Sequence, residues 1–303
     1  IAAIGITDYF TIQGYKHLRQ FQDEGRLQDI VLFPNIEFRL GTIVEKRRLN
    51  YHVLFSPNLP IDLIEEEFLH ALSFVHEKQP FERSHMRKLK LTNLIEFGAN
   101  LKKQHPGYRG SSALEIGCMN ATVSIDEIKE LLLEDERFAG QYLLVLAEEG
   151  LSLMDWDGQH HATRKQLMQT SHAIFSSNAG TKAFCLGEHH DTEEQFLDEF
   201  KSPKPCFWGC DSHGLNERFL EPNEERYCWI KGEVSWEGLR QVLFEPEARV
   251  RIQADNPEPQ KSVFTLDAVK IGATQVNDEL GIDDLQVKLN PNLVTIIGGR
   301  GSG

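Results

Sequence analysis

The sequence has no long hydrophobic run, few cysteines and a shortage of positive charge. No apolar stretch approaches the roughly 20 residues of a bilayer-spanning helix, and no secretory signal opens the chain, so we expect no membrane span. Five cysteines, an odd number, favour reduced thiols in a cytoplasmic protein over a disulfide framework. The net charge of -14 argues against a uniformly basic nucleic-acid surface, but it fits a site where carboxylates gather around cations.

The chain is longer than one typical domain. Its 303 residues predict a large domain with a smaller second piece, and its hydrophobic fraction of 40% is that of a folded globular protein. There is no initiator methionine, the apolar residues 1–6 open the chain, and the last residues fall within a glycine-rich motif. We therefore expect this chain to be part of a longer protein.

Short apolar segments alternate with amphipathic ones along the first two-thirds of the chain. Their composition and length predict six strands, at residues 1–6, 29–34, 50–55, 141–146, 172–176 and 205–209. The 3.6-residue pattern predicts helices at residues 13–23, 60–76, 124–134, 161–169 and 193–200. Ser124 followed by Glu127 is typical of a capping box at the start of the third helix. The alternation indicates a parallel α/β architecture, either a barrel or a doubly wound sheet.

A polar segment with two basic clusters interrupts this alternation at residues 78–112. The clusters lie at residues 87–90 and 102–103. A solvated helix and loop is the simpler interpretation, and we favour it over a nucleic-acid patch.

Composition divides the chain into three parts. Residues 1–222 hold the alternating pattern, residues 223–260 form a connector with a predicted helix over 235–243, and residues 261–303 are β-rich. Pro257 and Pro259 mark the end of the connector.

The final residues fit the first half of a P-loop. The apolar residues 293–297 predict a strand, and the candidate phosphate-binding residues follow it directly: Gly298, Gly299, Arg300, Gly301, Ser302 and Gly303. Glycines let backbone N–H groups turn towards phosphates, so we expect this loop to bind ATP with Mg²⁺ once the following lysine and serine or threonine are present. The alternative is a glycine-serine linker, which the preceding strand makes the weaker interpretation. The lead-in is similar to that of SMC- and RecF-like ATPases.

Acidic and imidazole residues follow three of the predicted strands. Asp8 comes after the first strand, Glu37 after the second, and Asp211 and His213 after the sixth, while His52 lies within the third. Because α/β barrels gather their sites at the carboxyl ends of strands, we expect these side chains to meet there.

These segments resemble the motifs of the PHP (polymerase and histidinol phosphatase) family. Gly-Ile-Thr-Asp at 5–8 matches its second motif, Pro-Asn-Ile-Glu at 34–37 its third, and Gly-Cys-Asp-Ser-His at 209–213 its last. Residues 227–252 resemble the connector of the subgroup in which such a domain precedes an SMC-like ATPase, the TrlF-like proteins. The resemblance to the PHP domain covers roughly residues 1–220.

The resemblance implies a distorted (β/α)7 PHP barrel followed by the start of an ABC/SMC-type P-loop ATPase domain. It implies Asp8, Glu37, Asp211 and His213 as catalytic residues, and these four together with His52 as metal ligands. Carboxylates with imidazoles suit Mn, Zn or Fe, which would activate water and stabilise the leaving oxygen of a phosphate ester.

The chain departs from the family at Tyr9, where the second motif ordinarily has a histidine. Neutral tyrosine is a poor ligand, so we expect one metal position to be altered; the first His-x-His motif would precede Ile1. His160, His161 and His172 lie where the family supplies a further ligand, and His189 and His190 form a second pair. A core or surface role is the simpler interpretation for each of these five, with the pair at 160–161 slightly the better candidate. Three cysteines fit no common zinc module and are interpreted as small buried residues: Cys206, Cys210 and Cys228.

The sequence is compatible with three functions. The first is a metal-dependent phosphodiesterase or nuclease, gated by the ATPase, that acts on nucleic acid, with DNA as the expected partner. Bacterial anti-phage defence is its expected setting, and a homodimer through the ATPase its expected assembly. The second is a phosphatase for small phosphate monoesters. The third is a catalytically inactive PHP domain that serves as a sensor or scaffold, which Tyr9 favours and the retention of Glu37, His52, Asp211 and His213 disfavours.

Overall fold

The chain folds into two compact units, Ile1–Asp255 and Asn256–Gly303. The computed structural model describes residues 1–44, 47–77, 85–152, 154, 156–190, 192–210, 212, 226–257, 268–275, 281–282 and 284–289. Most of the segment expected as a connector packs as part of the first unit.

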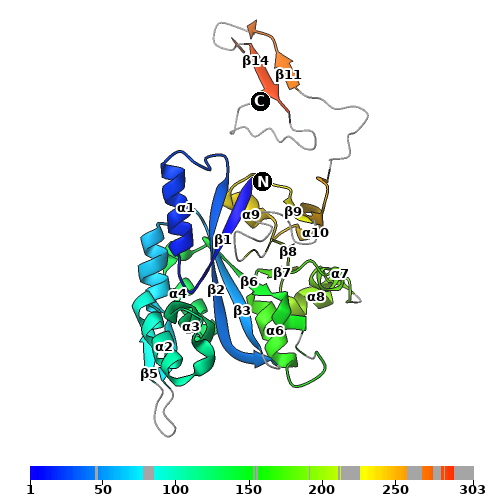
Figure 1. Ribbon diagram of the computed structural model, residues 1–303. Helices are drawn as coiled ribbons and strands as arrows, with labels where there is room; N and C mark the ends of the chain where they lie inside the picture. Colours follow the sequence, from blue (N-terminus) through cyan, green and yellow to red (C-terminus); the bar gives the residue numbers. More distant parts are fainter. Residues whose placement is uncertain are drawn as a thin grey trace. The chain divides into compact units, whose positions relative to one another are not determined.

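A curled six-stranded sheet forms the centre of the first unit (Figure 1). In spatial order its strands are β1 (Ala3–Tyr9), β2 (Val31–Val44), β3 (Arg47–Phe55), β6 (Tyr142–Ala147), β7 (Ala173–Phe175) and β8 (Cys206–Phe207). All six strands predicted from the sequence are therefore present, and the unit is a mixed α/β structure.

The sheet is mixed rather than parallel. β1 and β2 run parallel, as do β6, β7 and β8, but β3 is antiparallel to both of its neighbours. The prediction of a parallel sheet is wrong for β3 because this strand begins three residues after β2 ends. A parallel return would need a crossover of about a dozen residues or more.

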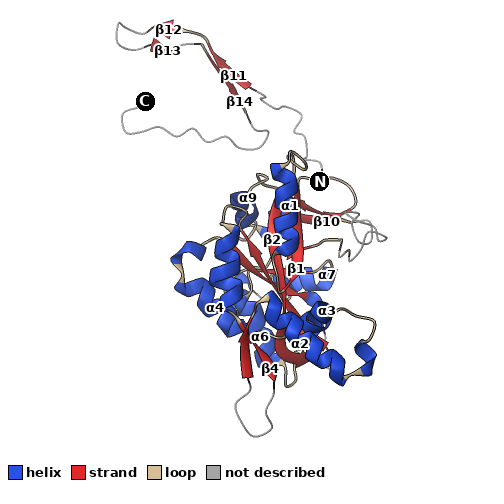
Figure 2. Ribbon diagram, turned by 60° about the vertical axis from the view of Figure 1, so that its left-hand side comes forward, coloured by secondary structure: helices blue, strands red, loops and turns tan. Residues whose placement is uncertain are grey.

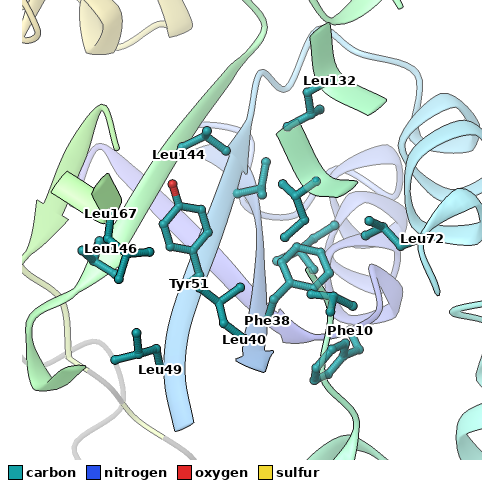
Figure 3. Close-up of a cluster of buried hydrophobic side chains, with 14 of the residues drawn as sticks. Phe10, Phe38, Leu40, Leu49, Tyr51, Leu72, Leu132, Leu144, Leu146 and Leu167 are labelled. Atoms are coloured by element: carbon teal, nitrogen blue, oxygen red, sulfur yellow. The ribbon is translucent and has the colours of Figure 1, made fainter. Parts of the chain in front are cut away.

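Helices cover one face of this sheet and bury the larger hydrophobic core. Alternate residues such as Phe38, Tyr51 and Leu146, which are register partners, project into it (Figure 3). The helices that contribute buried residues to this core include α1 (Gln13–Asp23), α4 (Ile125–Glu134), α6 (His161–Thr170) and α8 (Glu193–Phe200). Four of the predicted helices are thereby confirmed. Two short helices, α5 (Glu148–Ser152) and α7 (Ala179–Cys185), follow β6 and β7.

The opposite face carries a smaller core that the connector closes. Phe33, Val145 and Phe207 of the sheet pack with Trp236 and Leu239 of α9 (Trp236–Gln241), the helix predicted over 235–243. The Trp236 indole Nε1 donates a hydrogen bond to the Gly140 carbonyl at 2.9 Å, just before β6. β9 (Tyr227–Ile230), α10 (Pro246–Arg249) and β10 (Val250–Gln253) complete this layer.

The helix predicted over 60–76 is only partly correct. Leu63–Phe68 forms a π-helical segment and Leu69–Ala71 a 3-10 turn, after which β4 (Ser73–Glu77) pairs with β5 (His85–Lys88). The Ser73 backbone N–H donates to the Glu127 carboxylate. That bond also explains why the capping box predicted at Ser124 is wrong: the Ser124 hydroxyl accepts from Asp126 N–H, and Glu127 is engaged elsewhere.

Two helices follow β5 and lie side by side, α2 (Leu91–Gln104) and α3 (Ala113–Asn120) (Figure 2). α3 was not expected, and it begins with a capping box in which Ser112 and Glu115 exchange hydrogen bonds. Gly98 and Gly117 let the backbones approach: a Cβ at Gly98 would lie 1.8 Å from the Ala113 carbonyl oxygen, and one at Gly117 2.1 Å from that of Leu94. Neither contact can be relieved by rotating a side chain.

The second unit is β-rich, as expected. β11 (Ala268–Ile271) pairs antiparallel with β14 (Leu285–Lys288), and β12 (Thr274–Gln275) pairs with β13 (Gly281–Ile282). The strand predicted over 293–297 lies outside the described residues.

Neither a membrane-spanning helix nor a disulfide bond is found in the described part of the chain. No helix in the described ranges combines the length and apolar composition of a bilayer-spanning segment. All five cysteines are free thiols; Cys185 and Cys206 are buried, and Cys118, Cys210 and Cys228 are half-buried.

We predict that Gly98→Ala lowers the free energy of unfolding by about 3 kcal/mol, the upper end of the cost of overpacking, because the new methyl group meets backbone. Urea denaturation measures the change. Gly110→Ala is the matched control, since a Cβ there meets nothing within 4 Å. Equal stability of the two variants would show that the α2–α3 contact is not as close as described.

Candidate functional site

Glu37 and His52 are direct partners across two central strands. Glu37 of β2 is in register with His52 of β3, and Tyr9 at the end of β1 is the partner of Glu37 on its other side. Cross-strand partners project from the same face, so Glu37 and His52 form a row, whereas the Tyr9 ring at the strand end packs against the larger core. Glu37 is 6% exposed and His52 8% exposed. A buried carboxylate and a buried imidazole therefore lie next to each other on the face that carries the smaller core.

Asn35 is a further polar member of this site, and the sequence reasoning did not identify it. It is two residues before Glu37 on the same strand, hence on the same face, and it is 4% exposed. Its amide Nδ2 donates to Thr7 Oγ1 at 2.8 Å and lies 3.2 Å from His52 Nδ1. Its Oδ1 has no hydrogen-bond partner among the described residues. An unsatisfied buried carbonyl costs about 1–3 kcal/mol, so a donor or a cation at Oδ1 would be stabilised.

Burial keeps His52 neutral. It lowers the pKa of the imidazole from 6.5 to about 3, because the charged form is poorly solvated there. The Phe175 ring packs edge-on against it, with centroids 4.8 Å apart. Since Asn35 contacts Nδ1, Nε2 is the ring nitrogen left for another ligand.

Asp8 is directed away from this row. Its register partner is Ile36, so its side chain projects from the opposite face to Glu37. Both carboxylate oxygens accept backbone hydrogen bonds at 3.0 Å, from Gly14 and Tyr15 in the first turn of α1. Burial raises the pKa of this carboxyl, against the opposing effect of those two hydrogen bonds. The structure thus places Asp8 as a cap for α1 and does not bring it to Glu37 and His52.

Tyr9 is held by a cation–π contact. The Arg39 guanidinium lies 5.2 Å from the centroid of its ring, and Arg39 Nη1 donates to the Cys118 carbonyl at 3.0 Å. The Cys118 thiol in turn faces the Tyr9 carbonyl at 3.8 Å. Tyr9 is therefore built into the packing between β1, β2 and α3.

The other candidate histidines that the structure details have structural contacts. His161 packs against the Trp156 ring, the His172 Nδ1 accepts from Leu144 N–H at 2.9 Å, and His190 lies 3.3 Å from the Glu199 carboxylate. Burial lowers the pKa of His172 to about 4. Within the described ranges, no three His, Cys, Asp or Glu side chains are grouped as a metal site would require.

Part of the predicted site lies outside the described residues. This applies to Asp211 and His213, and also to the phosphate-loop residues Gly298, Gly299, Arg300, Gly301, Ser302 and Gly303.

Comparisons with protein-family models, with curated proteins and with solved structures find no match to this chain.

The side chains around Glu37 include donor types that can bind a divalent cation. They comprise one carboxylate, one imidazole held neutral by burial, and one buried amide oxygen with no partner among the described residues. Mixed nitrogen and oxygen donors of this kind suit Mn, Zn or Fe.

We predict that Asp8→Ala lowers the free energy of unfolding by about 1–2 kcal/mol, because α1 loses its N-terminal acceptor. Asp8→Asn keeps an acceptor oxygen and should cost less. Urea denaturation compares the two, and elemental analysis follows bound metal in parallel. Loss of metal in Asp8→Asn at unchanged stability would make Asp8 a ligand instead.

Proposed function

We propose that the first unit is a PHP-type, metal-dependent phosphodiesterase that acts as a nuclease and is coupled to an SMC-like ATPase. The observation that carries this proposal is the buried register pair of Glu37 and His52, with Asn35 beside it. The α/β sheet around the pair is compatible with a PHP barrel.

Glu37, His52 and Asn35 would hold the cation, with Asp211 and His213 added on the strength of the family motif. When bound, a divalent cation polarises a phosphate oxygen and acidifies water. Glu37 supplies negative charge that balances the ion. His52, neutral because it is buried, offers a ring nitrogen without first losing a proton. Asn35 fixes the orientation of that ring through Nδ1.

The coupling to an ATPase rests on the resemblance at residues 298–303. A completed P-loop there would bind ATP with Mg²⁺, and ATPases of this kind pair two subunits around nucleotide. In this proposal the ATPase module forms a homodimer on DNA and presents the nucleic acid to the phosphodiesterase. Defence against phage DNA is the proposed setting, by analogy of architecture.

A second function, an inactive domain that serves as a sensor or scaffold, is favoured by one observation. Tyr9, the register partner of Glu37, stands in the position of a ligand and is occupied by its contact with Arg39. In this alternative the buried side chains of Glu37, His52 and Asn35 stabilise the fold and do not take part in catalysis.

The test is hydrolysis of bis(p-nitrophenyl) phosphate and of labelled DNA and RNA by the full-length protein with Mn²⁺, with and without ATP. We expect Glu37→Gln and His52→Gln to lower the rate by more than about 100-fold, the upper end of what losing an outer-shell partner costs, and Asn35→Leu by about 10–100-fold. Asp8→Asn is the matched control and should retain the activity.

Two outcomes would contradict the proposal. Absence of hydrolysis on every substrate, together with absence of bound metal, would leave the scaffold function. Cleavage of p-nitrophenyl phosphate alone would identify a phosphatase for small monoesters.

A further inference from the structure

Residues 85–120 reverse the charge balance of the chain. They contain six lysines and arginines but only two acidic residues, whereas the whole chain has 32 basic and 46 acidic side chains. This segment, which comprises β5, α2 and α3, is called the basic helical pair below. One of its two acids, Glu115, already accepts the Ser112 backbone N–H in the capping box of α3.

Five of the six cations are exposed: Lys88, and the four residues Arg87, Lys90, Lys103 and Arg109. None of these four forms an ion pair with another residue in the described part of the chain. Lys88 and Lys102 donate instead to backbone carbonyls, those of Ala71 and Ser111. Two neighbouring carboxylates offset part of this charge from beyond ion-pair distance, since Glu66 interacts with Lys90 and Glu115 with Lys102.

The basic helical pair packs on the larger core and reaches the end of β1 through the last turn of α3. Cys118, in the last turn of α3, accepts from Arg39 and contacts the Tyr9 carbonyl. Tyr9 and Arg39 flank Glu37, as its register partner and as the residue two positions along β2. In both views α2 and α3 lie together at the side of the sheet (Figures 1 and 2). The last turn of α3 therefore lies next to Tyr9 and Arg39, the two neighbours of Glu37.

The spacing of the cations favours a polymer. Arg87 and Lys90 precede α2, whereas Lys103 and Arg109 lie at and beyond its end. The 14 residues of α2 separate these two groups by about 20 Å along the helix axis. A single phosphate cannot reach both groups, whereas a nucleic-acid strand in a duplex carries a phosphate about every 3.4 Å along the axis.

We propose that the basic helical pair binds the sugar-phosphate backbone of a nucleic acid and guides it to the Glu37–His52 site. The inference deepens the proposed function, on which it rests for the identity of the polymer as substrate. Recognition is through phosphate charge, so it is independent of base sequence and sensitive to salt. It replaces the interpretation of this segment as a merely solvated surface.

The test is the salt dependence of binding to fluorescein-labelled 30-nucleotide DNA and RNA, measured by anisotropy with the full-length protein. Two double variants are compared with wild type, Arg87→Gln/Lys90→Gln and Lys103→Gln/Arg109→Gln. Each should weaken binding to every sequence and reduce the slope of log K against log salt by about 1.4, as expected for two lost contacts with a single strand. Parallel DNA and RNA series show which polymer is preferred.

The control variant Lys129→Gln/Lys231→Gln removes the same charge from α4 and from the residue after β9, and should leave the slope unchanged. Unaltered slopes in both test variants would overturn the inference and leave the face to an acidic protein partner. An equal loss in the control would overturn it too, since charge alone would then explain the effect.

Hydrolysis of bis(p-nitrophenyl) phosphate separates the two proposals, because this small substrate does not need the basic helical pair. If the test variants hydrolyse this substrate normally and bind nucleic acid as wild type does, the basic helical pair does not bind nucleic acid, but the phosphodiesterase proposal stands. If the test variants bind nucleic acid more weakly and wild type hydrolyses nothing, the basic helical pair is a nucleic-acid-binding surface and the phosphodiesterase proposal is wrong.

Discussion

The antiparallel register between β2 and β3 is the constraint on which the rest of the site depends. It pairs Glu37 with His52 on one face and Phe38 with Tyr51 on the other. A slip of one residue would send the carboxylate and imidazole into the larger core and the two rings out of it, because strand side chains alternate. Hydrophobic packing under α1 and α4 thus fixes where the polar pair stands, although neither member of the pair belongs to that core.

Burial of the polar pair in turn decides its chemistry. On the face of the smaller core, Phe175 lies against His52, and the connector closes the sheet through Trp236. Loss of solvent lowers the pKa of His52 and leaves the Asn35 carbonyl without a partner among the described residues. The same low polarity destabilises an unpaired charge, so the proposed cation would have to be neutralised by donors such as Glu37. The connector therefore closes the core on the face of the sheet that carries Glu37 and His52.

The sequence was sufficient for the strands of the central sheet and insufficient for side-chain direction. Short apolar runs located all six strands, because buried strands are rich in branched and aromatic residues. Asp8 was assigned to the site because β1 was expected to end at residue 6; β1 runs to Tyr9, so alternation turns Asp8 towards α1. Asn35 was missed because amides are not common ligands, and its burial becomes visible only once β2 is paired on both edges. α3 was missed because its core contacts depend on Gly98 and Gly117 rather than on an apolar stripe.

Pulsed electron paramagnetic resonance of Mn²⁺ added to the purified protein would show whether Glu37, His52 and Asn35 share a cation. If His52 binds the ion directly, the spin-echo modulation spectrum shows a hyperfine coupling between Mn²⁺ and the imidazole nitrogen. This coupling disappears in His52→Gln while the protein remains folded. A spectrum of Mn²⁺ surrounded by water alone, identical in wild type and His52→Gln, would contradict the account.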